Sequence, residues 1–268
     1  MKKTSLLLTL VVLAASALAQ KSEKDSQMGP LTPQQCFSSG SGNTLVKVCI
    51  TDNGNVSYFE SPAGAVHLNG REGYALCTDE DNSFGIVHGF DVNYAADGWG
   101  SSSVSQPNGA GKFPLIITRQ TLDGAFQLKQ TFTANWKERG IDIKMDVKNL
   151  SASVIDDLRL TRSADIDISG SSDKDLFQIT QDSAVAEGYS VPFRGLMLTA
   201  APGTAGWGQA WNVLYSDWDA FGNGAQYARG CKASDVGGQG DYVSGFHWQG
   251  HWLKPGQTMS ATLRYRRF

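Results

Sequence analysis

Apolar and polar residues alternate along most of the chain. In residues 140–149 (GIDIKMDVKN), four apolar side chains alternate with four charged ones. Because successive side chains of a strand point to opposite faces, a strand separates the two sets completely. The apolar set is Ile141, Ile143, Met145 and Val147, and the charged set is Asp142, Lys144, Asp146 and Lys148. The pattern predicts a half-buried strand whose apolar face lies in the core.

Turn sequences separate further segments of this kind. Residues 52–55 (DNGN) lie between two apolar-rich segments, 44–51 and 56–61, and residues 122–125 (LDGA) form a second turn of the same type. Both turns contain the glycine that a tight hairpin needs at a positive φ. A Pro-Gly turn precedes a last predicted strand, 258–266.

The whole pattern indicates an all-β protein. No segment of 11 or more residues has the apolar stripe of an amphipathic helix, and the 30 glycines agree with short strands joined by loops. We predict a large two-sheet antiparallel β-sandwich with few or no helices. The chain is long enough for one such domain, 36–268, after a polar segment, 20–35, that we expect to be flexible.

Residues 1–19 have the features of a secretory signal peptide. Lys2 and Lys3 precede an apolar run, 6–14, and small residues, 17–19, end the segment. We therefore predict a secreted or periplasmic protein. No later apolar run approaches the roughly 20 residues of a membrane span. Without the two lysines, 21 basic side chains face 26 acidic ones, and the net charge of −5 disfavours nucleic acid as a partner.

Four cysteines are an even set, and in an exported protein this favours disulfides. Three pairings are possible. We prefer Cys36–Cys49 with Cys77–Cys231, because the first pair closes a short loop and the second links distant parts of the chain.

Two segments resemble the galactose-mutarotase-like β-supersandwich. Residues 145–168 (MDVKNLSASVIDDLRLTRSADIDI) carry an Asn-Leu-Ser turn between strands, and residues 252–268 (WLKPGQTMSATLRYRRF) carry a Leu-x-Pro-Gly turn before a closing strand. Residues 59–64 (FESPAG) and 105–109 (SQPNG) also resemble segments of secreted bacterial β-proteins. The resemblance implies a large two-sheet fold of a kind that often handles carbohydrate.

Residues 245–252 (GFHWQGHW) place two histidines four residues apart among large aromatic side chains. Glycine at both 245 and 250 favours a strand over a helix. In a strand the two histidines lie about 13 Å apart, too far for one zinc ion. The alternation predicts an aromatic core face and a polar face that could line a groove. The aromatic face contains Phe246, Trp248 and Trp252, and the polar face contains His247, Gln249 and His251.

Five of the seven tryptophans follow residue 200, and residues 207–224 (WGQAWNVLYSDWDAFGNG) combine three of them with polar residues. A tryptophan ring can stack on the apolar face of a pyranose while neighbouring polar groups bond its hydroxyls. The alternative is that these rings anchor the core and loops. The residues that we predict to contact carbohydrate are Trp99, Trp207, Trp211, Asp217, Trp218, Asp219, His247, Gln249 and His251.

Residues 165–175 (DIDISGSSDKD) resemble the start of a calcium loop, because short acidic side chains alternate around a glycine. Leu176 occupies the position of the usual bidentate glutamate, so the loop is incomplete. The alternative is a solvated acidic turn. The predicted Ca²⁺ ligands are Asp165, Asp167, Ser169, Asp173 and Asp175.

Signals for catalysis are few, since the chain contains neither G-x-S-x-G nor H-E-x-x-H. The mutarotase resemblance implies histidine acids and a late glutamate base, but no glutamate follows Glu187. The candidates for a histidine–aspartate pair are His88, His247, His251 and Asp241. We predict a secreted, lectin-like carbohydrate-binding protein. The alternatives are a glycan-active enzyme (epimerase, lyase or glycoside hydrolase) and a structural envelope protein.

Overall fold

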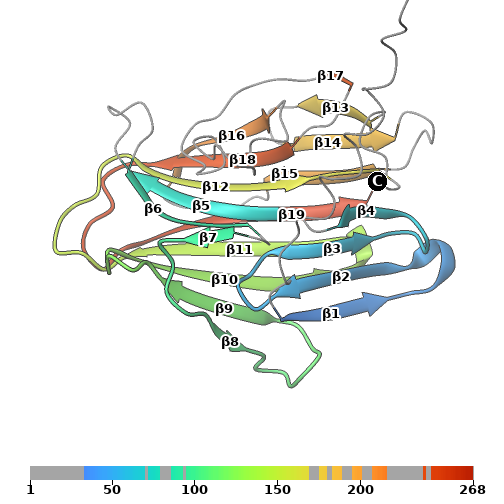
Figure 1. The fold of residues 1–268 in the computed structure, drawn as a ribbon, viewed down its shortest axis with the longest axis horizontal. Coiled ribbons are helices and arrows are strands. Elements are labelled where there is room, and N and C mark those ends of the chain that lie inside the picture. Colours follow the sequence, from blue (N-terminus) through green and yellow to red (C-terminus); the bar gives the residue numbers. More distant parts are fainter. Residues whose placement is uncertain are drawn as a thin grey trace, which may run out of the picture. The chain divides into compact units, whose positions relative to one another are not determined.

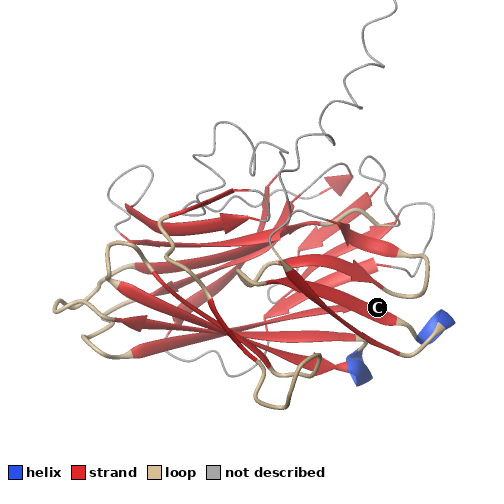
Figure 2. Ribbon diagram, turned by 60° about the horizontal axis from the view of Figure 1, so that its bottom comes forward, coloured by secondary structure: helices blue, strands red, loops and turns tan. Residues whose placement is uncertain are grey.

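The computed structural model describes residues 33–69, 72–78, 86–92, 95–168 and 243–267, and the backbone of five further strands. Strands fill most of these segments (Figure 2). The helical elements among them are two short 3₁₀ turns, η2 (Gly42–Thr44) and η3 (Trp136–Glu138). The all-β prediction is therefore confirmed. The predicted signal peptide, 1–19, lies outside the described residues, as does most of the segment 20–35.

The largest sheet has nine antiparallel strands. Across the sheet they are β17 (Gly238–Gln239), β13 (Asp175–Ile179), β14 (Ser183–Gly188), β15 (Gly195–Ala200), β19 (Thr258–Arg267), β11 (Gly140–Asn149), β10 (Phe126–Asn135), β9 (Leu115–Gln120) and β8 (Ser103–Ser105). The last strand of the chain, β19, thus lies inside the sheet, between β15 and β11 (Figure 1).

Two further antiparallel sheets complete the fold. The six-stranded sheet consists of β16 (Trp207–Tyr215), β18 (Val243–Gly250), β12 (Leu158–Asp165), β5 (Glu72–Thr78), β6 (Ile86–Val92) and β7 (Ala95–Asp97). The four-stranded sheet consists of β1 (Gln34–Ser39), β2 (Val46–Thr51), β3 (Val56–Glu60) and β4 (Val66–Asn69). Side chains of the six- and nine-stranded sheets meet in the core, where Arg162 bonds Gln130 and Tyr265 bonds Glu72.

The predicted alternation of residues 140–149 is confirmed in β11. Its four apolar side chains are fully buried in the core shared by the sheets, and its four charged ones are half-buried or exposed. Burial of each aliphatic side chain contributes roughly 1.5–3 kcal/mol. The apolar face of this one strand therefore fixes its register against both neighbouring strands.

Both predicted hairpins are present. The turn at residues 52–55 joins β2 to β3 with Gly54 at φ +94°, and the turn at 122–125 joins β9 to β10 with Gly124 at φ +73°. A side chain at Gly54 would also collide with the side chain of Gln130. Glycine is required there for its backbone conformation, and another residue would also have to displace the Gln130 amide.

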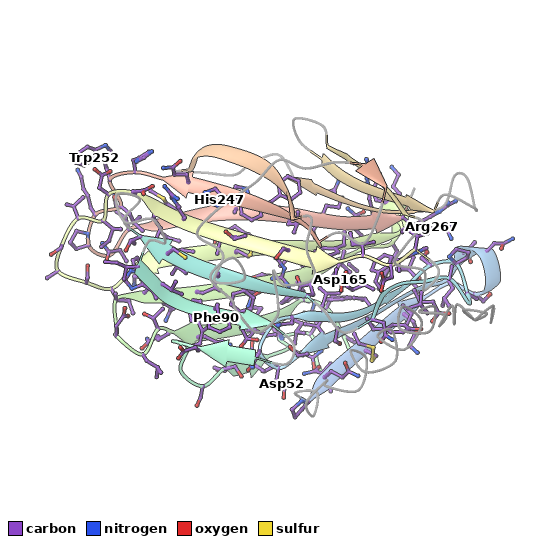
Figure 3. All side chains as sticks on the ribbon, turned by 45° about the horizontal axis from the view of Figure 1, so that its top comes forward. Asp52, Phe90, Asp165, His247, Trp252 and Arg267 are labelled. Atoms are coloured by element: carbon purple, nitrogen blue, oxygen red, sulfur yellow. A yellow bond between two sulfur atoms is a disulfide. The ribbon has the colours of Figure 1, made fainter. Side chains whose placement is uncertain are left out.

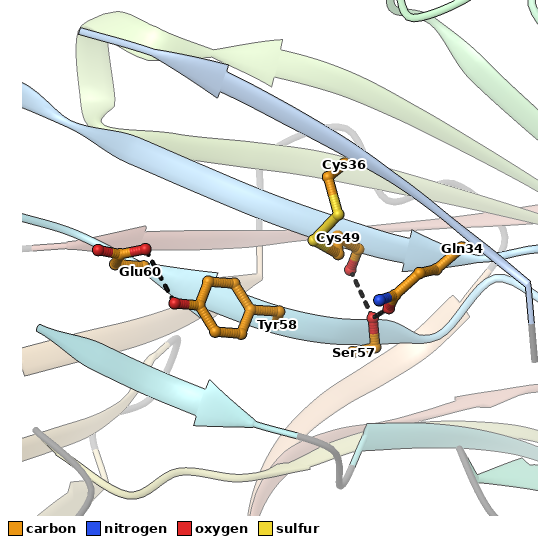
Figure 4. Close-up of a disulfide and its surroundings, with 6 residues drawn as sticks. All are labelled: Gln34, Cys36, Cys49, Ser57, Tyr58 and Glu60. Atoms are coloured by element: carbon orange, nitrogen blue, oxygen red, sulfur yellow. Dashed lines mark hydrogen bonds between the residues drawn. A yellow bond between two sulfur atoms is a disulfide. The ribbon is translucent and has the colours of Figure 1, made fainter. Parts of the chain in front are cut away.

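A disulfide joins Cys36 to Cys49 across the paired strands β1 and β2 (Figure 4). Beside it, Ser57 Oγ donates to the Cys49 carbonyl oxygen at 3.2 Å. The first predicted pairing is confirmed. Cys77 is also disulfide-bonded. Its predicted partner, Cys231, lies outside the described residues, so the second pairing stays a prediction.

All described residues belong to one compact unit, Leu31–Phe268. The domain limits predicted from the sequence, 36–268, stay a prediction. Within the described segments, no helix has the length and apolar character needed to cross a bilayer.

Candidate functional site

A row of polar side chains follows one face of β12. Leu158, Leu160, Arg162 and Ala164 point into the core, so the alternate positions occupy the opposite face. That opposite face carries Arg159, Thr161, Ser163 and Asp165. The neighbouring strand β18 continues the pattern, because Phe246 and Trp248 are buried in the core while His247 and Gln249 share the polar face.

The register of the strands brings predicted residues together. His247 is the partner of Thr161 on one side and of Trp211 on the other, while Gln249 is the partner of Arg159 and Gln209. The His247 ring nitrogen Nδ1 lies 3.3 Å from Thr161 Oγ1. Two parts of the chain that the sequence analysis treated separately, 207–224 and 245–252, are therefore adjacent strands of one sheet.

The imidazole of His247 is held in its neutral form. Its side chain is 2% exposed. Burial and, after it, the positive charge of Arg159 lower the pKa of His247 to about 4, against the opposing effect of Asp157. A neutral histidine can both donate and accept a hydrogen bond at neutral pH.

Past the end of the sheet, two loop segments lie together. Ile155 and Leu253 exchange backbone hydrogen bonds of 2.9 and 2.8 Å. Next to this bridge, Gln249 Nε2 donates to Asp157 Oδ1 at 2.6 Å, and Arg159 donates to the other oxygen of Asp157 at 3.2 Å. The two strands and their loops are thus connected through one carboxylate.

Trp252 stands at the outer edge of these loops (Figure 3). Its side chain is 68% exposed, and its backbone has a φ of +62°. The prediction that Trp252 belongs to the aromatic core face is therefore wrong. Strand β18 ends at Gly250, and the left-handed backbone at Trp252 breaks the alternation on which that prediction depended.

Charged and polar side chains occur in the same two loop segments as this ring and at the strand ends next to them. His251 Nδ1 lies 3.4 Å from Asp156 Oδ1, and both side chains are about half exposed. Asp157 also has a positive φ, +43°. A non-glycine residue in that region costs of order 1 kcal/mol or more and is common at functional sites. We call this group the Trp252 cluster; it consists of Asp156, Asp157, Arg159, Gln249, His251 and Trp252.

His88 does not belong to this cluster. It lies in a β-bulge of β6, where the partners of Leu76 and Cys77 are Gly89 and Val87. The bulge turns the imidazole toward the nine-stranded sheet, where it packs edge-on against Phe126 at 4.7 Å between ring centroids. His88 and His247 therefore lie on opposite faces of the six-stranded sheet and do not form one catalytic pair.

Trp99 lies in the core. It is buried, its ring centroid lies 5.7 Å from that of Tyr74, and the guanidinium of Arg119 lies over it. Trp99 therefore anchors the core, which was the alternative to contact with carbohydrate.

Several predicted residues cannot be placed in the site. Trp207 and Trp211 are described only as backbone. The predicted carbohydrate contacts Asp217, Trp218 and Asp219 and the catalytic candidate Asp241 lie outside the described residues.

The predicted calcium loop is described only in part. Asp165 ends β12, Asp167 follows it, and the backbone of Asp175 begins β13, while Ser169 and Asp173 lie outside the described residues. Among the residues that the structure describes, no three acidic, histidine or cysteine side chains gather into a metal site. The calcium site stays a prediction.

Two ion pairs in the core were not foreseen. The Arg162 guanidinium bonds Glu72 at 2.6 Å with both side chains fully buried, and Arg119 bonds Asp91 beside Tyr74. Burial raises the pKa of Glu72 to about 7, against the charge of Arg162 and hydrogen bonds from Tyr265 and the Val56 N–H. The sequence contained a sign that Arg162 is buried, because Arg162 follows Leu158 and Leu160 at every second position, on the face that points into the core.

Two solved structures share this arrangement of sheets. A bacterial glucoamylase in complex with acarbose matches 89% of this chain and 34% of its own, with a TM-score of 0.59 and 10% identity. An Escherichia coli K12 protein named as a candidate aldose 1-epimerase matches 88% of this chain and 99% of its own, with a TM-score of 0.51 and 10% identity. The chain has a galactose-mutarotase-like fold.

At this identity the likeness concerns the fold alone. The chain spans about a third of the length of the glucoamylase. No protein-family model matches the sequence, and no curated protein sequence matches it. The fold resemblance inferred from residues 145–168 and 252–268 is confirmed, and it now rests on most of the chain instead of on those two segments.

Proposed function

We propose that this protein binds carbohydrate at the Trp252 cluster. The observation that carries the proposal is the exposed ring of Trp252, on a left-handed backbone in loops that also carry the paired His251 and Asp156. An exposed aromatic face can stack on a pyranose, and the surrounding groups can bond its hydroxyls.

The strand register supports the same site. Trp207 is the partner of Gly250, directly before His251, and Trp211 is the partner of His247. Trp207 therefore lies on the neighbouring strand at the end where the Trp252 cluster begins, whereas the row of His247 and Thr161 is buried. The two similar structures are a glucoamylase with a bound inhibitor and a candidate aldose epimerase, which agrees with a carbohydrate ligand. The disulfide suits the oxidising surroundings of a secreted or periplasmic protein.

A glycan-active enzyme is the second candidate. His251 and Asp156 lie 3.4 Å apart beside Trp252, and such a pair can exchange protons with a sugar hydroxyl. A glycoside hydrolase would need two carboxyl groups on opposite sides of the bond, and Asp156 and Asp157 are neighbours on one loop. This arrangement favours binding over hydrolysis.

The test is a glycan and polysaccharide array probed with the mature protein, in calcium and in EDTA. We expect selective binding that falls about 10-fold in Gln249→Ala, which removes an amide from the cluster. The matched control is Gln35→Ala on β1, where binding should not change. Loss of binding in EDTA would implicate the acidic loop. Absence of binding to every glycan in both buffers would contradict the proposal, and conversion of a bound glycan would favour the enzyme.

A further inference from the structure

Each ring nitrogen of His88 lies within hydrogen-bond distance of one polar side chain. Its Nε2 lies 2.8 Å from Thr78 Oγ1, and its Nδ1 lies 2.5 Å from Asp123 Oδ2. Thr78 ends β5, His88 lies in the bulge of β6, and Asp123 lies in the hairpin between β9 and β10. Three separate elements therefore supply a hydroxyl, an imidazole and a carboxylate in series.

The carboxylate is ionised and fixed in position. Partial burial by itself raises the pKa of Asp123, but hydrogen bonds from Thr121, the Ala125 N–H and His88 lower it below its ordinary value. Oδ1 accepts from Thr121 Oγ1 at 2.5 Å and from the Ala125 N–H at 2.9 Å. An ionised Asp123 accepts the proton of Nδ1, so Nε2 is left to accept the proton of the Thr78 hydroxyl.

The series formed by Thr78, His88 and Asp123 is accessible from solvent. The His88 side chain is 12% exposed and that of Asp123 is 45% exposed. Two exposed aliphatic side chains stand beside it: Ile86 is the strand partner of Thr78, and Leu122 precedes Asp123. An apolar group can therefore approach the hydroxyl.

We propose that Thr78, His88 and Asp123 form an ester-hydrolysing site for a short apolar acyl group. The proposal is independent of the carbohydrate site at Trp252. Its basis is the geometry in which a base lies between a nucleophilic hydroxyl and an orienting carboxylate, an arrangement defined by distances and roles and not by sequence order.

In the first step, Thr78 Oγ1 forms a bond to the acyl carbon while its proton passes to His88 Nε2. The ester C–O bond then breaks, and the leaving alcohol takes that proton. In the second step, water adds to the acyl carbon and gives a proton to Nε2. The acid is released, and Thr78 Oγ1 regains its proton. Asp123 is a positioning residue that holds Nδ1 and stabilises the imidazolium.

The experiment uses the mature protein with p-nitrophenyl butyrate and, separately, with a fluorophosphonate probe followed by peptide mass spectrometry. We expect hydrolysis above the buffer rate and a covalent label on Thr78. Thr78→Val should reduce hydrolysis to the buffer rate, whereas Thr78→Ser should keep it. Thr133→Val, which changes an exposed threonine on β10, is the matched control and should behave as wild type.

Asp123→Asn should lower the rate about 10⁴-fold and shift the pH profile, which a merely structural role would not do. An unlabelled Thr78 in the wild-type protein, or equal hydrolysis by wild type and Thr78→Val, would overturn the proposal. The labelling result is read on the wild-type protein, so it decides the matter even where a variant does not fold.

Discussion

The buried imidazole of His247 links pH to stability at the scale of a single residue. Burial and the charge of Arg159 lower the pKa of His247 to about 4, whereas an unfolded chain has a value near 6.5. Between these two values the unfolded state binds more protons than the folded one. Stability contributed by neutral His247 is therefore complete above about pH 6.5 and is lost as the pH falls toward 4.

We expect this effect to reach on the order of 3 kcal/mol. The free energy of unfolding in urea, measured at pH 7.5 and pH 4.5, should fall more in wild type than in His247→Gln. The variant keeps a polar side chain next to Thr161 but has no proton to bind. Equal pH dependence of the two proteins would show that His247 titrates normally.

The residue scale also shows where sequence reasoning fails. The alternation in residues 245–252 correctly separated Phe246 and Trp248 from His247 and Gln249. It failed at Trp252, because a strand pattern carries no sign that the strand has ended and that the next backbone is left-handed. The bulge that turns His88 toward Asp123 could not be read from the sequence for the same reason.

At the scale of elements, β12 carries different chemistry on its two faces. One face forms the polar row, whose side chains are also buried, while the other face carries Arg162 between apolar neighbours. That guanidinium also bonds Gln130 of the nine-stranded sheet and the Gly54 carbonyl oxygen of the β2–β3 hairpin. One buried cation thus connects all three sheets.

Removal of Arg162 should be costly, because Glu72 would stay buried without its partner. We expect Arg162→Met to lower the free energy of unfolding by about 3–5 kcal/mol, and Arg162→Met with Glu72→Gln to recover part of that loss. The matched control is the half-exposed pair Arg264–Asp142, where Arg264→Met should cost less than about 1 kcal/mol. The free energies of unfolding are measured in urea. If Arg162→Met and Arg264→Met lowered them equally, the buried ion pair would contribute no more to stability than the exposed one.

The elements themselves were largely predictable. Period-two patterns located β11, the two hairpins and the strand that became β19. Their arrangement was not predictable, since nothing in residues 258–266 indicates that they insert between β15 and β11. Pairing over such separations depends on the fit of whole faces, which short sequence patterns do not contain.

At the scale of the whole molecule, the large exposed apolar side chains of the described residues lie at strand ends and in the loops between strands. The described loops and strand ends at this end of the sheets are connected by backbone bonds between Leu150 and Ala125 and between Ile155 and Leu253. The large apolar side chains exposed there are Ile86, Leu122, Leu150, Val154 and Trp252. Among them Trp252 alone has an aromatic ring on which a sugar can stack.

The most direct test of the carbohydrate proposal is the affinity of Trp252→Gly for the glycans that wild type binds on the array. Glycine accepts the positive φ of residue 252 without strain, so the variant should be about as stable as wild type. We predict that Trp252→Gly binds these glycans about 10-fold more weakly than wild type, or more weakly still. Leu150→Ala, an exposed apolar change in the adjacent loop, should leave binding intact. Unchanged affinity in Trp252→Gly would contradict the account and place any glycan site elsewhere.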